Sequence, residues 1–472
     1  MEKLKTVILL YLVIQSMVLT YILWFDKGDY EKVAFTVEEP YIFQEAHDPE
    51  KAVSPARFSM PGPEENQYYF LKPGMEGYDS TWESIYSWLE QGVIEEVEEG
   101  TDIPPDGDSE MVLWFEPPFP VENWRESLPG KEPKKMKKVE LYVEEDEVLF
   151  LVNLEDRQSV IKESRSELVQ EIKEELAEAK EHSLLYSLWE EEEMGAYLGE
   201  RFTVAPGEYY LPAEEIELTR PVLEWDREDL SSEKLINAFF LDTDMLRQIE
   251  VGEGEVIYTD GKEYLHFKAN EFEYSAPPAK GGGVSFSYRQ AVGKATEYLC
   301  HYGGWPENLY LKAVSFQQES PFIEGTGYYQ ARWNYYYQGF PLAGKEIQME
   351  YNDRGLVDYH RPLQVLQKED GAVIKIAPVE EVLAQTGNIL REAGESDEQG
   401  ENQDNESRED NVEVEEKTLE KLYLAYYVGD HEYRAPEPAW VVRVDGEILV
   451  LQADSLNILH RGEDKDEFFP GS

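Results

Sequence analysis

The first apolar stretch of the chain, Thr6 to Phe25, contains no charged residue. Its roughly 20 residues are enough to cross a hydrocarbon core of about 30 Å as a helix. Lys3 and Lys5 precede it, and acidic residues follow it. Because positive charge marks the cytoplasmic side, this pattern predicts a single transmembrane helix with residues 1–5 in the cytoplasm and the bulk of the chain extracellular.

A cleaved signal peptide is the alternative for this stretch. Cleavage needs small residues after a short apolar core. Here the core continues into the bulky run Tyr21 to Phe25, which favours a retained anchor.

Beyond the anchor, stretches with helical spacing of apolar residues alternate with stretches of strand-like alternation, which indicates an α+β fold. Trp82, Ile85 and Leu89 recur at spacings of three and four, which predicts a helix from Ser80 to Gln91. Similar spacing predicts helices over about 164–181 and 288–301 and one beginning at Ala377-Pro378.

Strands and hairpins are predicted by short apolar runs bounded by turn residues. The strand Glu110 to Phe115 is expected to end at Pro117-Pro118. Hairpins are expected across an acidic turn after Val143, across Asp260-Gly261 and across Asp445-Gly446; the last two pairs favour type I′ turns. The aromatic-rich run from Tyr328 to Tyr337 predicts a packed strand, or alternatively a protein-binding face.

Changes in composition along the chain suggest its domain organisation. Two sheet segments, Glu273 to Pro277 and Asp358 to Pro362, share the pattern acid-Tyr-x-x-Pro. Either the last two domains are related, or the match between these two short segments arose by chance. The predicted parts are a cytoplasmic tail (1–5), the membrane helix (6–25), an N-terminal extracellular α+β domain (26–205), a middle α+β domain ending in a Gly281–Gly283 hinge (206–283), a C-terminal α+β domain with a disordered acidic insertion at 391–416 (284–462), and a tail (463–472).

The net charge of −56, from 43 basic and 99 acidic residues, argues against nucleic acid as a partner, because such binding needs a basic surface. Cys300 is the only cysteine, which excludes an intrachain disulfide. We expect it to be a small buried apolar residue, in a bacterial surface protein stabilised by packing.

No catalytic pattern stands out. None of the seven histidines lies three or four residues from another, so no helical metal pair is expected. Ser159 to Lys162 matches a Ser-x-x-Lys motif, but its companion motifs are missing. Carboxylates are too abundant for a catalytic pair to be picked out. We therefore expect no enzyme activity, cofactor or metal.

Several short strings scattered along the chain are similar to those of one known family: Leu4–Leu10 with Met17–Trp24, Glu110–Pro120, Tyr209–Pro212, Tyr258–Gly261, Phe272–Pro277, His301–Trp305, Gln338–Pro341 and Tyr359–Leu363. Through them the chain resembles the YycH family, the membrane-anchored accessory proteins of the WalK–WalR two-component system. No catalytic signature is among these strings, and the acidic insertion and extreme charge are not expected of the family.

The resemblance implies a three-domain extracellular α+β protein that acts in cell-wall homeostasis. It also implies that the chain pairs with a YycI-like single-pass protein and that both contact the transmembrane helices of a WalK-type sensor histidine kinase.

Helix packing in lipid favours small residues and buried polar groups, such as Ser16, Thr20 and Gln15 here. The predicted partner-binding stripe is Leu12, Gln15, Ser16, Leu19, Thr20 and Leu23.

The sequence leaves two other functions open. The chain could be an anchored cell-wall hydrolase, which would use one or two carboxylates in a cleft. It could also be a ligand-sensing surface protein, which would have a pocket with convergent polar groups.

Overall fold

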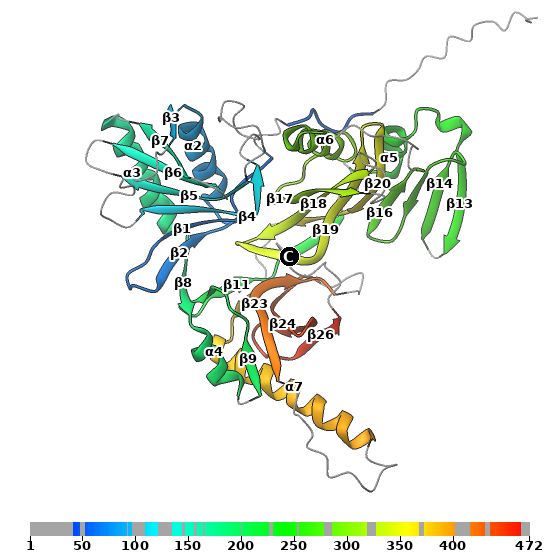
Figure 1. Ribbon diagram of the computed structural model, residues 1–472. Coiled ribbons are helices and arrows are strands. Elements are labelled where there is room, and N and C mark those ends of the chain that lie inside the picture. The colour runs from blue at the N-terminus through cyan, green and yellow to red at the C-terminus, as the bar shows by residue number, and fades with distance from the viewer. Residues whose placement is uncertain are drawn as a thin grey trace, which may run out of the picture.

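The computed structural model of the chain (Figure 1) describes residues 41–47, 52–91, 93–96, 109–120, 135–143, 147–154, 158–163, 166–199, 201–225, 230–252, 254–277, 286–318, 327–367, 372–401, 416–429 and 435–463. The predicted membrane helix, the Gly281–Gly283 hinge and most of the acidic insertion lie outside these ranges. Within them, no helix is both long and apolar enough to span a membrane.

An antiparallel sheet forms the N-terminal part of the described chain. The strands that the described ranges contribute to it, in spatial order, are β10 (Tyr209–Pro212), β8 (Leu184–Trp189), β2 (Gln67–Leu71), β1 (Arg57–Pro61), β4 (Met111–Pro120), β5 (Lys135–Val143), β6 (Val148–Leu154), β7 (Gln158–Glu163) and β3 (Val93–Glu96).

Helices α2 (Tyr78–Gln91) and α3 (Ser166–Glu181) cover one face of this sheet. Their apolar stripes pack against the strand side chains that point toward them, such as Phe58 and Leu71, in one buried core. Thr81 also donates a hydrogen bond of 2.8 Å to Glu175 between the two helices. Both helices lie within two residues of their predicted bounds.

A second, larger sheet holds most of the remaining strands. Its spatial order within the described residues is β13 (Arg247–Gly252), β14 (Glu255–Thr259), β15 (Tyr264–Phe267), β16 (Glu271–Ser275), β20 (Gly355–Pro362), β19 (Phe340–Asn352), β23 (Lys417–Tyr427), β24 (Glu437–Val444), β25 (Glu447–Gln452) and β26 (Ile458–Glu463). Strand β18 (Gly327–Tyr337) joins β19 to β17 (Leu309–Gln318), and β9 (Phe202–Val204) pairs with β23.

Strand β19 connects the two halves of the larger sheet. Its later residues pair antiparallel with β20, whereas Leu342 and Ala343 near its start pair in parallel with β23. Two small sheets add further links, β11 (Glu217–Thr219) with β22 (Val373–Lys375) and β12 (Val222–Trp225) with β21 (Gln364–Gln367).

Helix α5 (Ser232–Phe239) packs against β15, β16 and β20, whereas α6 (Tyr288–His301) packs against β17, β18 and β19. Ser287 and Gln290 form a reciprocal capping box that fixes where α6 begins. The buried side of α6 includes Ala291, Leu299 and Cys300, and the burial of Cys300 confirms its predicted role.

At the other end of the larger sheet, α7 (Val379–Glu401) packs against α4 (Glu191–Leu198), as Figure 1 shows. Gly387 permits this contact, because a Cβ there would lie 2.2 Å from the Leu198 carbonyl oxygen. Helix α7 continues through residues 391–401, which the sequence predicted to be disordered. Acidic residues can lie on the solvated surface of a helix, so their abundance after residue 391 does not show where α7 ends.

The α+β class is confirmed, and the two acid-Tyr-x-x-Pro segments turn out to be neighbours. Strand β16 pairs antiparallel with β20, which sets Tyr274 opposite Tyr359. Because β16 lies in the predicted middle domain and β20 in the predicted C-terminal domain, the sheet continues across that predicted boundary. The domain division itself, and any relation between those domains, stay predictions.

Two local predictions were wrong and one was confirmed. Asp445 and Gly446 both have positive φ, at 49° and 76°, as a type I′ turn requires. In the hairpin at Asp260-Gly261, only Gly261 has a positive φ, so the turn is not type I′. The Asp260 side chain instead accepts hydrogen bonds from the backbone N–H groups of Lys262 and Glu263, which stabilises a different turn. Strand β4 also continues through Pro117-Pro118 to Pro120.

Candidate functional site

The predicted partner-binding stripe, Leu12, Gln15, Ser16, Leu19, Thr20 and Leu23, lies outside the described residues and stays a prediction. Two other features gather functional side chains in the described part of the chain. One is a cleft between the two large sheets, and the other is a polar network on the larger sheet.

The cleft has a volume of about 410 Å³. It lies against the face of the N-terminal sheet that α2 and α3 leave uncovered, because strand alternation points Arg57 and Phe70 away from the helix-packed residues Phe58 and Leu71. The opposite wall comes from the β18–β19 hairpin and from residues 420–424 of β23.

Two glycines allow the walls to approach each other. Gly74 has a φ of +77°, and a Cβ on it would lie 2.9 Å from the Tyr336 backbone carbonyl. Gly339, at the tip of the β18–β19 hairpin, has a φ of +84°, and its Cβ would lie 2.7 Å from the Met75 sulfur. Side chains at either position would therefore push the hairpin away from the N-terminal sheet.

Arg57 lies among aromatic rings at one side of the cleft. Its guanidinium carbon is 5.1, 5.0 and 5.2 Å from the ring centres of Phe70, Trp114 and Tyr210. One guanidinium nitrogen lies 3.3 Å from the Glu116 carboxylate. Such cation–π contacts offset part of the cost of removing the charge from water.

Lys72 lies directly after β2, on the other side of Phe70. Its ammonium donates a hydrogen bond of 2.9 Å to the Tyr186 hydroxyl and is 4.1 Å from the centre of the Tyr186 ring. Burial lowers the pKa of Lys72 to about 7; repulsion from Arg57 contributes to the lowering, and Glu116 opposes it. Burial raises the pKa of the Tyr186 hydroxyl, so that group stays neutral near pH 7.

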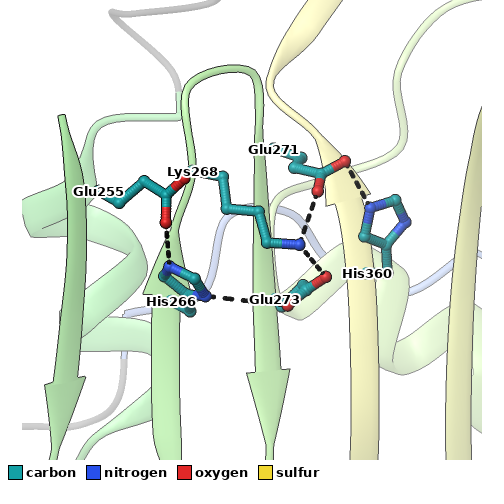
Figure 2. A network of polar contacts seen from close by, with 6 residues as sticks. All are labelled: Glu255, His266, Lys268, Glu271, Glu273 and His360. Carbon is teal, nitrogen blue, oxygen red and sulfur yellow. Dashed lines mark hydrogen bonds and ion pairs between the residues drawn. The ribbon is translucent and has the colours of Figure 1, made fainter. Parts of the chain in front are cut away.

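The polar network lies on the face of the larger sheet opposite Phe272 and Tyr359, across β14, β15, β16 and β20 (Figure 2). Glu273 stands between His266 and His360 in the strand register. The network consists of Glu255, His266, Lys268, Glu271, Glu273 and His360.

Each member of this network has an oppositely charged or hydrogen-bonding neighbour. His360 Nε2 is 2.8 Å from Glu271, and His266 lies 3.3 Å from Glu255 and 3.9 Å from Glu273. Lys268 donates to both Glu271 and Glu273, the former at 2.9 Å.

The hydrogen bond from His360 holds the pKa of Glu271 at about 2, despite the opposing effect of burial. Burial alone would lower the pKa of Lys268, but the two carboxylates raise it.

Glu271, Glu273 and His360 each offer a ligand atom, and these atoms lie within 4.8 Å of one another. Carboxylate and imidazole are suitable ligands for a divalent metal. However, the Lys268 ammonium already lies between the two carboxylates, as Figure 2 shows. A metal would have to displace it, so the arrangement is best described as part of an ion-pair network that joins four strands.

Sequence reasoning identified neither feature. The cleft combines residues from β1, β2, β4, β8, β10, β18, β19 and β23, which only long-range packing of the strands brings together. The sequence offered only a local signal: Lys72 closely follows the aromatic run Tyr68 to Phe70, and Arg57 precedes Phe58, in a chain with 99 acidic residues.

The fold and cleft define an α+β protein in which a helix-covered N-terminal sheet meets a second, larger sheet. Residues 2–180 match the N-terminal domain of the YycH protein, and this match ends close to the end of α3. No curated protein matches the chain.

The fold is similar to that of the crystal structure of YycH from Bacillus subtilis, with a TM-score of 0.56, 14% sequence identity, and coverage of 87% of this chain and 98% of that one. An uncharacterized protein from Eubacterium rectale gives a TM-score of 0.36 at 12% identity, covering 56% of this chain and 91% of its own, and supports no argument. The N-terminal part of the chain therefore matches the YycH family, and the fold of most of the chain is similar to that of a YycH protein, which confirms the resemblance seen in the sequence.

Proposed function

We propose that this protein is a non-enzymatic, membrane-anchored regulator of a WalK-type sensor histidine kinase in cell-wall homeostasis. It would act with a YycI-like single-pass partner through contacts between transmembrane helices. The observation that carries the proposal is the YycH N-terminal domain match over residues 2–180. That match includes the apolar stretch from Thr6 to Phe25, which suggests that the anchor and the folded part work as one protein.

The stripe through Gln15 and Ser16 is the proposed contact surface. A polar side chain near the bilayer centre is costly unless it has a partner, and small residues let helices approach closely. Exchange of residues 6–25 for an unrelated membrane helix should keep the protein anchored but abolish its control of the kinase.

A sharper experiment replaces Gln15 and Ser16 by Leu and measures co-purification with the YycI-like partner and the kinase. The matched control replaces Ile14 and Tyr21 by Leu, because neither lies three or four residues from a stripe residue and helical spacing places both on the opposite side of the predicted helix. We expect the first pair to reduce co-purification and the second pair to leave it intact. Equal association of both variants would remove the stripe from the proposal.

The hydrolase alternative makes a different prediction. An anchored enzyme would keep its activity after the helix exchange and lose it when one or two carboxylates in a cleft were replaced. Incubation of the purified full-length protein with peptidoglycan tests this directly. We expect no release of soluble fragments, and reproducible turnover that survives the helix exchange would favour the enzyme.

A further inference from the structure

The inner part of the cleft holds two cations beside one carboxylate. Arg57 is paired with Glu116 at 3.3 Å, whereas Lys72 contacts the neutral hydroxyl of Tyr186. In the described ranges no carboxylate forms an ion pair with Lys72. The chain as a whole has a net charge of −56, so an excess of positive charge at this point is a local property of the cleft.

The aromatic rings hold both cations in place without neutralising them. Arg57 lies beside three rings at about 5 Å, and Lys72 lies over the Tyr186 ring at 4.1 Å. The Arg57 Nε atom is buried and has no hydrogen-bond partner within the described chain. Cation–π contacts leave the N–H groups at the edge of a guanidinium available for an anion.

Acidic residues at the rim limit how much negative charge a ligand can carry. Glu208 is exposed and accepts a hydrogen bond of 3.3 Å from Tyr210. Glu420 is paired with Arg443 at 2.6 Å. These carboxylates and Glu116 line the same cleft as Arg57, Lys72 and Lys421, so the lining carries three residues of each sign. A ligand with one negative charge is therefore accommodated beside Lys72 more readily than a ligand with two.

We propose that the cleft binds a small organic monocarboxylate, such as the C-terminal residues of a short peptide. Its carboxylate would lie between Lys72 and Arg57, and its body would pack against Phe70, Tyr210 and Phe340. The volume of about 410 Å³ leaves room for more than a carboxylate group, since ligand pockets range from roughly 300 to 1,000 Å³.

Isothermal titration calorimetry on the full-length protein in an uncharged detergent tests the ligand class. The probe is N-acetyl-alanyl-alanine with a free carboxylate, compared with its C-terminal amide and with inorganic phosphate. We expect the carboxylate to bind at least ~10-fold more tightly than the amide, because a charge-assisted hydrogen bond is lost. Equal binding of the amide, tighter binding of phosphate, or no carboxylate binding up to ~10 mM would overturn the proposal.

Three variants locate the site. Lys72→Met should weaken carboxylate binding at least ~10-fold, whereas Lys72→Arg should retain most of it. The control Lys294→Met removes a lysine that is paired with Glu297 on the exposed side of α6 and should change nothing. Thermal unfolding of each variant shows whether it is folded. Unchanged binding by a folded Lys72→Met protein would refute the assignment.

Proton uptake gives a second readout. The groups facing Lys72 are Arg57, Glu116 and the neutral Tyr186 hydroxyl. With a pKa of about 7, Lys72 is mostly uncharged at pH 8, and an anion that binds beside it favours the charged form. Binding at pH 8 should therefore take up a proton, measured as a heat that depends on the buffer, and should weaken as pH rises.

The absence of proton uptake in a protein that binds the carboxylate would place that ligand elsewhere. Binding in the cleft and control of a kinase are separate properties. If exchange of residues 6–25 left kinase control intact, the carboxylate-binding result would still stand. Equally, a failure to bind carboxylate would leave the proposed kinase regulation untouched.

Discussion

Lys312 and Glu346 form a buried ion pair whose loss should be costly. Lys312 is the extra residue at a bulge between β17 and β18, and its ammonium lies 3.7 Å from the Glu346 carboxylate on β19. Their side chains are 4% and 8% exposed. Gln348 also donates a hydrogen bond to Glu346. Replacement of Lys312 by Met keeps most of its apolar stem but leaves Glu346 buried without this cation.

The expected loss follows from the geometry. At 3.7 Å and an effective dielectric constant of about 20, the attraction is about 4.5 kcal/mol. Measured losses on breaking buried pairs are about 3–5 kcal/mol. We therefore expect Lys312→Met to lower the midpoint of thermal unfolding by at least ~6 °C.

A double variant separates the charge effect from packing. Lys312→Met combined with Glu346→Met removes both charges, so it should recover most of the lost stability, because a buried pair replaced by apolar residues is often neutral overall. Lys294→Met, at the more exposed pair with Glu297, should cost at most ~1 kcal/mol. The reasoning would be refuted if the double variant were as unstable as the sum of its single variants in differential scanning calorimetry.

Three further predictions concern residues that hold the two sheets and the network in place. Gly339→Ala should destabilise the protein by about 1–3 kcal/mol, and by more than Gly446→Ala. Both glycines have positive φ, but only at Gly339 would the added Cβ also meet Met75. Equal midpoints of the two variants in chemical denaturation would contradict this prediction. Arg361→Met should speed hydrogen exchange at the end of α6, since Arg361 donates hydrogen bonds of 2.8 Å to the Gly303 and Gly304 carbonyls; unchanged exchange there would argue against it. The pKa of Glu271 is lowered from 4.5 to about 2, so its ionised carboxylate stabilises the fold fully above pH 4.5 and this effect is lost as pH falls toward 2. Glu271→Gln should therefore be less stable than the wild type above pH 4.5, and the difference in stability should shrink in acid. A stability difference that does not change with pH would refute the assignment.

Periodicity was sufficient to predict much of the local structure. The predictions of helices α2, α3 and α6 and of the Asp445-Gly446 turn were confirmed. Each depends only on residues that are close together in the sequence. The end of β4 and the turn at Asp260 were not predicted correctly. In the second case a single side-chain hydrogen-bonding pattern decided the conformation.

Long-range pairing could not be predicted in the same way. Nothing in the residues of β16 specifies β20 as its neighbour, or sets Glu273 between His266 and His360. The cleft has the same origin, because Arg57 and Lys72 acquire their shared surroundings only when the β18–β19 hairpin reaches the N-terminal sheet. The predicted membrane stripe, in contrast, depends on residues 6–25 and needs its own experiment.

The parallel pairing of β9 with β23 has a consequence for the order of folding. Phe202 to Val204 pair with Lys417 to Leu419, more than 200 residues later in the chain. During synthesis, β9 must therefore wait without its neighbour until almost the whole polypeptide has emerged, whereas β1 and β2 can pair early. A protein truncated before residue 417 would leave the β9 edge unpaired and open to association with other chains.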